Sequence, residues 1–324
     1  MKKKIFITGY MFAFLFCCSR VYAETGTDAE EYMKSAIEKM TENPRMIGTP
    51  EIDDAKEYLV SELKNWGYDV QEQDFFYDDR LNEKAIQSRS NKEEYLRGAF
   101  TGSEGDKRGT NIIAEKAGSS SDRTLIISAH YDTCENSPGA NDNASGVAVL
   151  LNAARMYSQK DYPFNIRFIC FSGEEAWFAG SRYYVSSLED SGYDNIMGVI
   201  NIDSVAEKSN LDYWVMVSEG KEVVDESGTV DFEPIANEIS ELITKKTEYQ
   251  LVCQMNSDHY PFSLLGIPAV TITQDLSEEL HINSSEDTMS YIDSNRLVEV
   301  FSTVDDIIQK ETALASLAGA TAAN

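Results

Sequence analysis

Short apolar runs separated by longer segments of helical periodicity are the feature that most constrains the fold of this chain. Runs such as TLIISAH at 124–130 and GVINI at 198–202 have the length of a strand and few polar residues. Near-continuous apolar strands that alternate with helices are typical of a mainly parallel sheet covered on both faces. The sequence therefore predicts a three-layer α/β/α fold with a mixed, mainly parallel central sheet of about eight strands.

These patterns also place the individual elements. The expected strands are 69–76, 111–115, 124–130, 164–171, 196–202, 211–217 and 267–273. The expected helices are 27–40, 52–66, 144–157, 176–188, 232–246 and 294–315. Gly67 is expected to cap the C-terminus of helix 52–66. The polar stretch 78–108, which contains Gly and Ser, predicts a loop.

Residues that commonly bind metals stand near the ends of the apolar runs. They are His130, Asp142, the pair Glu174 and Glu175, Asp203, and His281. Because the carboxyl ends of parallel strands meet at one edge of a sheet, we expect these side chains to converge. Two histidines and four carboxylates form a common ligand set for two zinc-like cations, with one carboxylate left as a base. The pattern therefore predicts a two-metal hydrolase.

Each of these residues also has a simpler structural explanation. His130 could end a strand without binding a metal, although Asp132 lies two residues on and could fix its tautomer. Asp142 could cap the helix that follows it, and the two glutamates could stabilise the start of another helix. His259 is expected to have a structural or pocket-wall role. The recurrence of such residues at successive strand ends favours the metal site for the others.

Other catalytic patterns are absent from the sequence. It contains no G-x-S-x-G nucleophile motif, no P-loop, no G-x-G-x-x-G after a strand and no H-E-x-x-H. Three cysteines follow the N-terminal segment, namely Cys134, Cys170 and Cys253, so a disulfide scaffold is not expected. Cys170 is expected in the core. Pairing of Cys134 with Cys253 is left open by the sequence.

The N-terminus and the net charge limit the compartment and the partners. Residues 1–23 have Lys2 to Lys4, an apolar stretch too short to span a bilayer, and Val21-Tyr22-Ala23, a pattern typical of a cleaved signal peptide. Residues 24–324 would then be a single secreted domain without stable membrane association. They contain 24 basic and 55 acidic residues, a net charge of −31. This charge argues against nucleic-acid binding and favours cationic ligands such as a peptide N-terminus, or simply solubility.

The motifs HYD, GANDNASGVAVLL, FSGEEAWFAGS, NIDS, SDHYPF and H…DT occur in that order between residues 111 and 293. This series resembles the co-catalytic, two-zinc metallo-aminopeptidases of the bacterial leucyl aminopeptidase and aminopeptidase S type. Glutamate carboxypeptidase II and glutaminyl cyclase are relatives of that group. The segment RMIGTPE and the helix after it are also similar to the opening of the family. HINSSEDT carries one residue more than the usual spacing, so the loop of His281 is expected to differ in shape.

The resemblance implies a role for each site residue. Asp142 would bridge two zinc ions, His130 and Asp203 would complete the ligands of one, and Glu175 and His281 those of the other. Glu174 would be the general base, and Asp132 would support catalysis beside His130. The resemblance also implies a cis peptide bond at Asp142-Asn143.

The function implied is that of a secreted zinc exopeptidase that removes N-terminal residues from peptides. A protease-associated insert is not expected. A single-zinc glutaminyl cyclase, a carboxypeptidase or dipeptidase of the same family, and a binding protein without catalysis are the alternatives. An intact ligand set and a spare Glu174 favour catalysis over binding alone. Trp177, Phe178, Tyr260 and Phe262 are candidates for an apolar substrate pocket.

Overall fold

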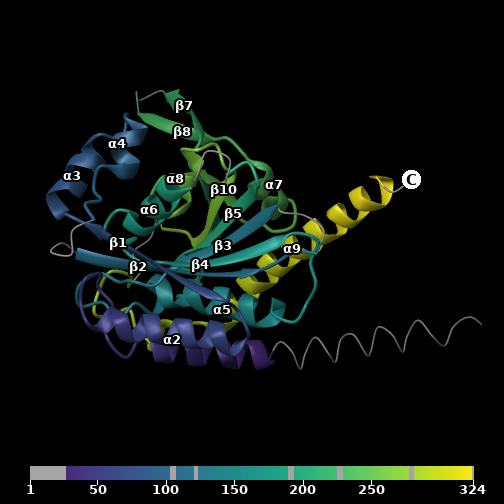
Figure 1. The fold of residues 1–324 in the computed structure, drawn as a ribbon, viewed down its shortest axis with the longest axis horizontal. Coiled ribbons are helices and arrows are strands. Elements are labelled where there is room, and N and C mark those ends of the chain that lie inside the picture. The colour runs from purple at the N-terminus through teal and green to yellow at the C-terminus, as the bar shows by residue number, and fades with distance from the viewer. Residues whose placement is uncertain are drawn as a thin grey trace, which may run out of the picture.

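The computed structural model describes residues 27–102, 107–119, 123–188, 193–224, 229–276 and 281–322. The expected signal peptide, residues 1–23, lies outside these ranges. No helix within the described ranges is both long enough and apolar enough to cross a membrane. Figure 1 shows the fold, with the described residues coloured by position.

Eight strands form one sheet, as predicted. Their spatial order is β1 (Val70–Tyr77), β2 (Lys107–Lys116), β4 (Asn165–Phe171), β3 (Thr124–His130), β5 (Ile196–Ile202), β10 (Ala269–Gln274), β6 (Tyr213–Val217) and β9 (Gln250–Cys253). The central strands β4, β3, β5 and β10 are mutually parallel. Strands β2 and β6 pair antiparallel with the outer members of that group. The mixed, mainly parallel sheet is confirmed.

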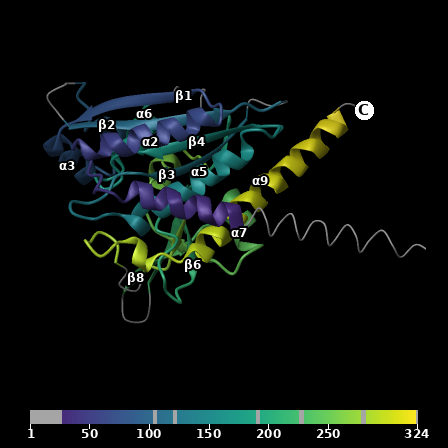
Figure 2. The same cartoon turned by 90° about the horizontal axis from the view of Figure 1, so that it is seen from below.

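Helices cover both faces of this sheet (Figure 1). On one face lie α2 (Glu51–Asn65), α5 (Gly146–Tyr157) and α9 (Ser294–Ala322), as the view in Figure 2 also shows. The other face carries α6 (Ala179–Ser187) and α8 (His259–Ser263), while α7 (Glu238–Thr244) packs against β5, β6 and β10. Each face has its own apolar cluster, and several β3 and β4 side chains contribute alternately to the two. This alternation explains why the strands read as continuous apolar runs.

The first two predicted helices are present, and the second of them, α2, ends with the expected glycine cap. Residues 27–40 and α2 are helical where their periodicity predicted helices. Gly67 has φ +89° and its backbone N–H donates to the carbonyl of Lys64, so its predicted capping role is confirmed.

The prediction of a loop over 78–108 was wrong. Two helices, α3 (Asp79–Gln87) and α4 (Lys92–Arg97), occupy most of it. The Asp78 carboxylate accepts from the backbone N–H groups of Arg80 and Leu81, and Asn91 caps α4 in the same way. Each helix buries only a few side chains, so its composition resembles that of a loop. The N-cap residue of each helix is nevertheless present in the sequence.

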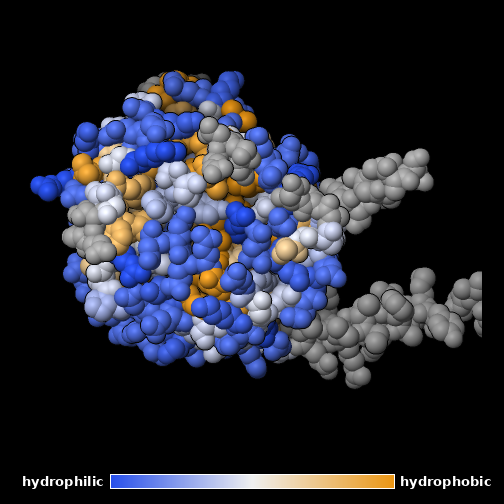
Figure 3. All heavy atoms as spheres, viewed as in Figure 1, coloured by the Kyte–Doolittle hydropathy of each residue, from blue (hydrophilic) through white to orange (hydrophobic). Residues whose placement is uncertain are grey.

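The prediction of a helix over 232–246 was wrong in its first part. A hairpin of β7 (Gly220–Val224) and β8 (Val230–Pro234) precedes α7, which begins only after the Asn237 cap. Many of the exposed large apolar side chains of the described residues lie on this hairpin or just after it: Val223, Val224, Val230, Phe232 and Ile235. Figure 3 shows a mainly hydrophilic surface with orange spheres at the top, where Figure 1 places the hairpin.

Candidate metal centre

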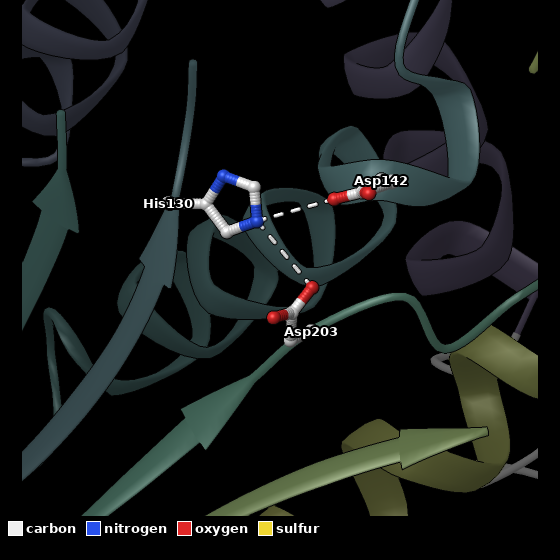
Figure 4. A group of neighbouring side chains, drawn as sticks. All are labelled: His130, Asp142 and Asp203. Carbon is white, nitrogen blue, oxygen red and sulfur yellow. Dashed lines mark hydrogen bonds and ion pairs between the residues drawn. The ribbon is translucent and has the colours of Figure 1, made fainter. Parts of the chain in front are cut away.

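Three of the predicted ligands meet at the carboxyl edge of the parallel strands. His130 is the last residue of β3, Asp203 follows β5, and Asp142 lies in the turn before α5. The Nε2 atom of His130 lies 3.2 Å from Oδ1 of Asp142 and 3.4 Å from Oδ1 of Asp203 (Figure 4). One ligand atom from each residue lies within 4.8 Å of the others, and all three side chains are largely buried. The predicted convergence is confirmed for these residues.

Asp132 orients the ring of His130 through the Nδ1 atom. Its Nδ1 lies 3.2 Å from the backbone carbonyl oxygen of Asp132 and 3.5 Å from that residue's carboxylate. A proton on Nδ1 therefore donates to Asp132 and leaves Nε2 facing the two carboxylates. Burial alone would lower the pKa of His130, but Asp203, Asp132 and Asp142 raise it well above the usual value. In the absence of a cation, a proton on this ring offsets the neighbouring negative charge.

The carboxylate of Asp132 has a second contact that the sequence did not reveal. Its oxygens accept from the backbone N–H groups of Glu174, at 3.1 Å, and Glu175, at 3.3 Å. The same residue therefore fixes the His130 ring and the start of the glutamate loop. Asp132 therefore connects the segment after β3 with the segment after β4, through a contact between residues 42 positions apart.

The turn that carries Asp142 is held by partners from two other segments. The Asp142-Asn143 peptide bond is cis, as the family resemblance implied. The carboxylate of Asp287 accepts from the backbone N–H groups of Asn141, at 2.7 Å, and Asp142, at 2.9 Å. The amide of Asn143 donates to the carbonyl of Ile202 at the end of β5. Asp142 is thus held on one side by Asp287, which lies between β10 and α9, and on the other by the contact of Asn143 with the end of β5.

A buried arginine supports the same region from the N-terminal segment. Arg45 is 1% exposed, and its guanidinium donates to the carbonyl oxygens of Met40, Tyr131, Pro138 and Gly139. Burial lowers its pKa to about 10, so the group stays charged. Neither Arg45 nor the role of Asp287 was predicted from the sequence. Most of their contacts join residues far apart in the chain.

Glu174 and Glu175 stand in a turn between β4 and α6. The expected helix 176–188 begins only at Ala179, because Trp177 (φ +60°) and Phe178 (φ +62°) adopt the left-handed conformation. Burial, with Asp203 and Glu175 nearby, raises the pKa of Glu174 well above its usual value. Burial and the Asp142 carboxylate raise the pKa of Glu175 to about 8.

One oxygen of Glu175 fits a site for a cation. Its Oε1 is buried and has no hydrogen-bond partner among the described residues, while Oε2 accepts from the thiol of Cys134 at 2.9 Å. A buried carboxylate oxygen without a donor, near other carboxylates, is stabilised by a positive ion. Cys134 and Cys253 are free thiols in the structure, and Cys170 is buried in the core as expected.

His281 lies apart from the group of His130, Asp142 and Asp203. Its ring stacks on Tyr291 with 3.7 Å between centroids, and its Nδ1 lies 2.6 Å from Oε1 of Glu207. The backbone N–H of His281 also donates to Glu207, at 3.0 Å. A proton on Nδ1 donates to this carboxylate and leaves Nε2 as the atom available to a metal. Glu207 is a functional candidate that the sequence analysis missed.

A cavity of about 350 Å³ opens beside the carboxylates. Asp142, Glu174, Glu175 and Asp203 line its acidic part. Trp177, Phe178, Met216, Leu276 and Ile282 supply apolar walls. Two of the four aromatic pocket candidates therefore line it, whereas Tyr260 and Phe262 pack in the apolar cluster under α6 and α8. His259 is fully buried and does not line the cavity.

Comparison with known proteins agrees with this arrangement. Residues 111–308 match peptidase family M28. Aminopeptidase YwaD of Bacillus subtilis is 30% identical over 200 residues, which cover 58% of this chain and 42% of that protein. The chain spans less than half the length of the curated relatives it matches.

Solved structures share the fold over most of the chain. BSAP, a zinc aminopeptidase from Bacillus subtilis, gives a TM-score of 0.70 at 19% identity, covering 87% of this chain and 94% of that one. Porphyromonas gingivalis glutaminyl cyclase gives 0.65 at 24% identity, covering 88% and 98%. Because the family match extends over more than half of its residues, the chain belongs to peptidase family M28.

Proposed function

We propose that the protein is a zinc-dependent aminopeptidase that removes N-terminal residues from peptides. The observation that carries the proposal is the placement of His130 Nε2 between the carboxylates of Asp142 and Asp203, with Glu174 close by but outside that group. A protein that only binds metal has no need of a further buried carboxylate beside the ligands. Family membership and the zinc aminopeptidase among the structural relatives support the same reaction class.

In this proposal two zinc ions bind per chain. His130, Asp142 and Asp203 would hold one, and Asp142, Glu175 and His281 would hold the other. Glu207 supports His281 as Asp132 supports His130, since each accepts from Nδ1 of the ring and leaves Nε2 free. Zinc in such a site polarises a carbonyl group and lowers the pKa of bound water.

The protein's own side chains would perform the remaining steps. Glu174, which is half-buried at the cavity wall, would accept a proton from the attacking water and deliver it to the leaving amine. Asp132 would keep Glu174 in position through the backbone N–H contact. The apolar walls would accommodate the first side chain of the peptide, and the acidic surroundings would attract its ammonium group.

We further propose that residues 1–23 are a cleaved secretion signal and that residues 24–324 form a single catalytic domain without a protease-associated insert. The pattern of charged, apolar and small residues supports the first point. One continuous sheet, covered on both faces, supports the second.

Glutaminyl cyclase activity is the second candidate. The match to the solved cyclase extends over 98% of that protein. Its sequence identity to this chain is 24%, against 19% for BSAP. A cyclase would need only one zinc and would convert an N-terminal glutamine into a ring without adding water. The complete set of five predicted ligands, Asp203 and His130 included, favours two metals and hydrolysis.

The deciding experiment combines metal analysis with a panel of aminoacyl-p-nitroanilides and a glutaminyl peptide. We expect about two zinc per chain, release of p-nitroaniline, loss of activity on chelation, and recovery when zinc is restored. Glu174→Gln should keep the zinc and lose activity, whereas Glu222→Gln, on the exposed hairpin, should behave like the parent. Cyclisation without amide hydrolysis would replace the aminopeptidase proposal with the cyclase.

A further inference from the structure

His259 is buried in α8, yet it is connected to the metal centre by hydrogen bonds. It is fully buried, with Nε2 2.9 Å from the backbone carbonyl oxygen of Gln254 and Nδ1 2.8 Å from the hydroxyl of Thr271. A carbonyl only accepts, so Nε2 carries the proton. Burial lowers the pKa of His259 to about 4, which keeps the ring neutral. Nδ1 is therefore an acceptor, and the Thr271 hydroxyl donates to it.

The chain of contacts continues from Thr271 to Asp203. Asn201 Nδ2 donates to the Thr271 hydroxyl oxygen at 3.1 Å and to the Ser257 hydroxyl oxygen at 2.8 Å. The Ser257 hydroxyl in turn donates to Oδ2 of Asp203 at 2.7 Å. Thr271, Asn201 and Ser257 are all fully buried. Water therefore has no access through which it could replace a missing partner.

The direction of every bond in this chain follows from the state of His259. Thr271 has one hydroxyl proton and gives it to His259, so its oxygen must accept from Asn201. The Asn201 amide then points its two protons at Thr271 and Ser257, and its oxygen accepts from Ser128 at 2.9 Å. Ser257, which already accepts, has its proton free for Asp203.

The hydrogen bonds of this chain could also run in the opposite direction, and Ser257 would then not donate to Asp203. If the Asn201 amide turned over, its oxygen would face Thr271 and Ser257, and both hydroxyls would donate to it. Ser257 would then have no proton left for Asp203, and Oδ2 would lose its shortest hydrogen bond. An acceptor at Nδ1 of His259 favours the first arrangement, because only there does Thr271 donate to the ring.

We propose that His259 is a positioning residue that acts through Thr271, Asn201 and Ser257 to hold Asp203 with its Oδ1 atom toward His130. This inference rests on the proposed metal site, because it assigns His259 a role in the affinity of that site for zinc. Asp203 Oδ1 lies 3.4 Å from His130 Nε2, while Oδ2 is fixed by Ser257. Outer partners of metal ligands commonly change affinity by about ten- to a hundredfold.

The test measures the affinity of the protein for zinc by competition with a chromophoric chelator. It uses residues 24–324, the chain without the proposed signal. Thr271→Val breaks the chain with little change of volume, and His259→Leu removes the acceptor. His259→Asn keeps an acceptor near the position of Nδ1. Tyr68→Phe is the matched control, because it removes one buried hydrogen bond, from Tyr68 to the Ala154 carbonyl, away from the site.

We expect zinc to bind about tenfold more weakly to Thr271→Val and His259→Leu, and with nearly parental affinity to His259→Asn and Tyr68→Phe. Replacement of zinc by cobalt provides a spectroscopic measure, since the visible bands of Co²⁺ should shift in the first two variants alone. Unchanged affinity and spectra in a folded Thr271→Val would overturn the proposal, as would a parent protein that binds no zinc. If Thr271→Val does not fold, His259→Leu and His259→Asn decide the same question. A parent that binds zinc but hydrolyses no peptide would refute the aminopeptidase and not this role of His259.

Discussion

The two halves of the proposed metal centre differ in how closely the structure brings their side chains together. In the His130 half, formed by His130, Asp142 and Asp203, the side chains are largely buried and close to one another. In the His281 half, formed by Glu175 and His281, one carboxylate oxygen is buried with no hydrogen-bond partner among the described residues, and the imidazole is 31% exposed. The side chains of the first half contact one another directly, whereas in our proposal those of the second half are joined only through the cation. The two halves should therefore respond differently to substitution.

The largest expected effect separates the shared ligand from the ligands of one half. Asp142→Asn should lose both metals, so zinc content should fall from about two per chain to near zero and activity should disappear. His281→Asn should lose about one zinc and leave the other in place. Metal analysis after dialysis checks both. Two zinc ions retained by His281→Asn would remove His281 from the ligand set.

The next effect concerns the metal-free protein and pH. Folding raises the pKa of Glu175 to about 8 and raises that of His130 and Glu174 as well, so the folded chain binds more protons than the unfolded one. Stability should fall as pH rises from about 5 to about 8, and Glu175 alone should contribute on the order of 3 kcal/mol to that loss. The pKa of His259, lowered to about 4, opposes this trend up to about pH 6.5, and the lowered pKa of Asp203 opposes it only below about pH 4.

Thermal or urea unfolding at several pH values, with and without zinc, measures this dependence. Zinc takes the place of the protons, so the loaded protein should show a flatter profile and higher stability at pH 8. A metal-free protein whose stability is constant or rises between pH 5 and 8 would contradict the raised pKa values of Glu174, Glu175 and His130.

A smaller effect should be confined to the His281 half. Glu207→Gln removes the charge that orients His281 Nδ1, so the zinc held by Glu175 and His281 should lose about tenfold in affinity. The zinc held by His130 and Asp203 should be unaffected. Glu286→Gln is the matched control, because Glu286 is exposed and lies 3.9 Å from Nε2 of the same ring. Equal losses for both zinc ions would mean that the two halves are not separate units.

The smallest effect tests the cavity wall. Trp177 is 50% exposed and has φ +60°, which glycine adopts without strain. Trp177→Gly should leave zinc binding unchanged, alter stability by about 1 kcal/mol or less, and raise KM for leucyl-p-nitroanilide several-fold. Steady-state kinetics with leucyl and alanyl substrates check this. A change in zinc content would show that the turn also shapes the ligands.

The parallel strands and the residues at their ends were predictable because both depend on local pattern. Strand 196–202 has the predicted bounds, and His130, Asp142 and Asp203 meet as the strand-end argument required. The cis bond at Asp142-Asn143 came from family resemblance rather than from pattern. Local periodicity failed where few side chains are buried, as in α3 and α4, and in the hairpin that replaced part of a helix.

The supporting residues were not predictable for a different reason. Glu207 contacts His281 across 74 positions, and Asp287 contacts Asn141 across 146. Nothing in a single sequence distinguishes such an acid from the many others on a chain with 55 of them. Only the fold shows which carboxylate accepts from the ligand turn and which one faces solvent.

The buried guanidinium of Arg45 extends the catalytic unit beyond the segment that carries its motifs. Arg45 lies outside residues 111–308, yet three of its guanidinium hydrogen bonds go to carbonyl groups of the loop between His130 and Asp142. A fragment trimmed to the family match would keep every proposed zinc ligand and leave the carbonyls of Tyr131, Pro138 and Gly139 without this donor. A fragment meant to keep these contacts therefore has to begin upstream of Arg45 and include the helical segment at 27–40, where the Met40 carbonyl accepts from the same guanidinium.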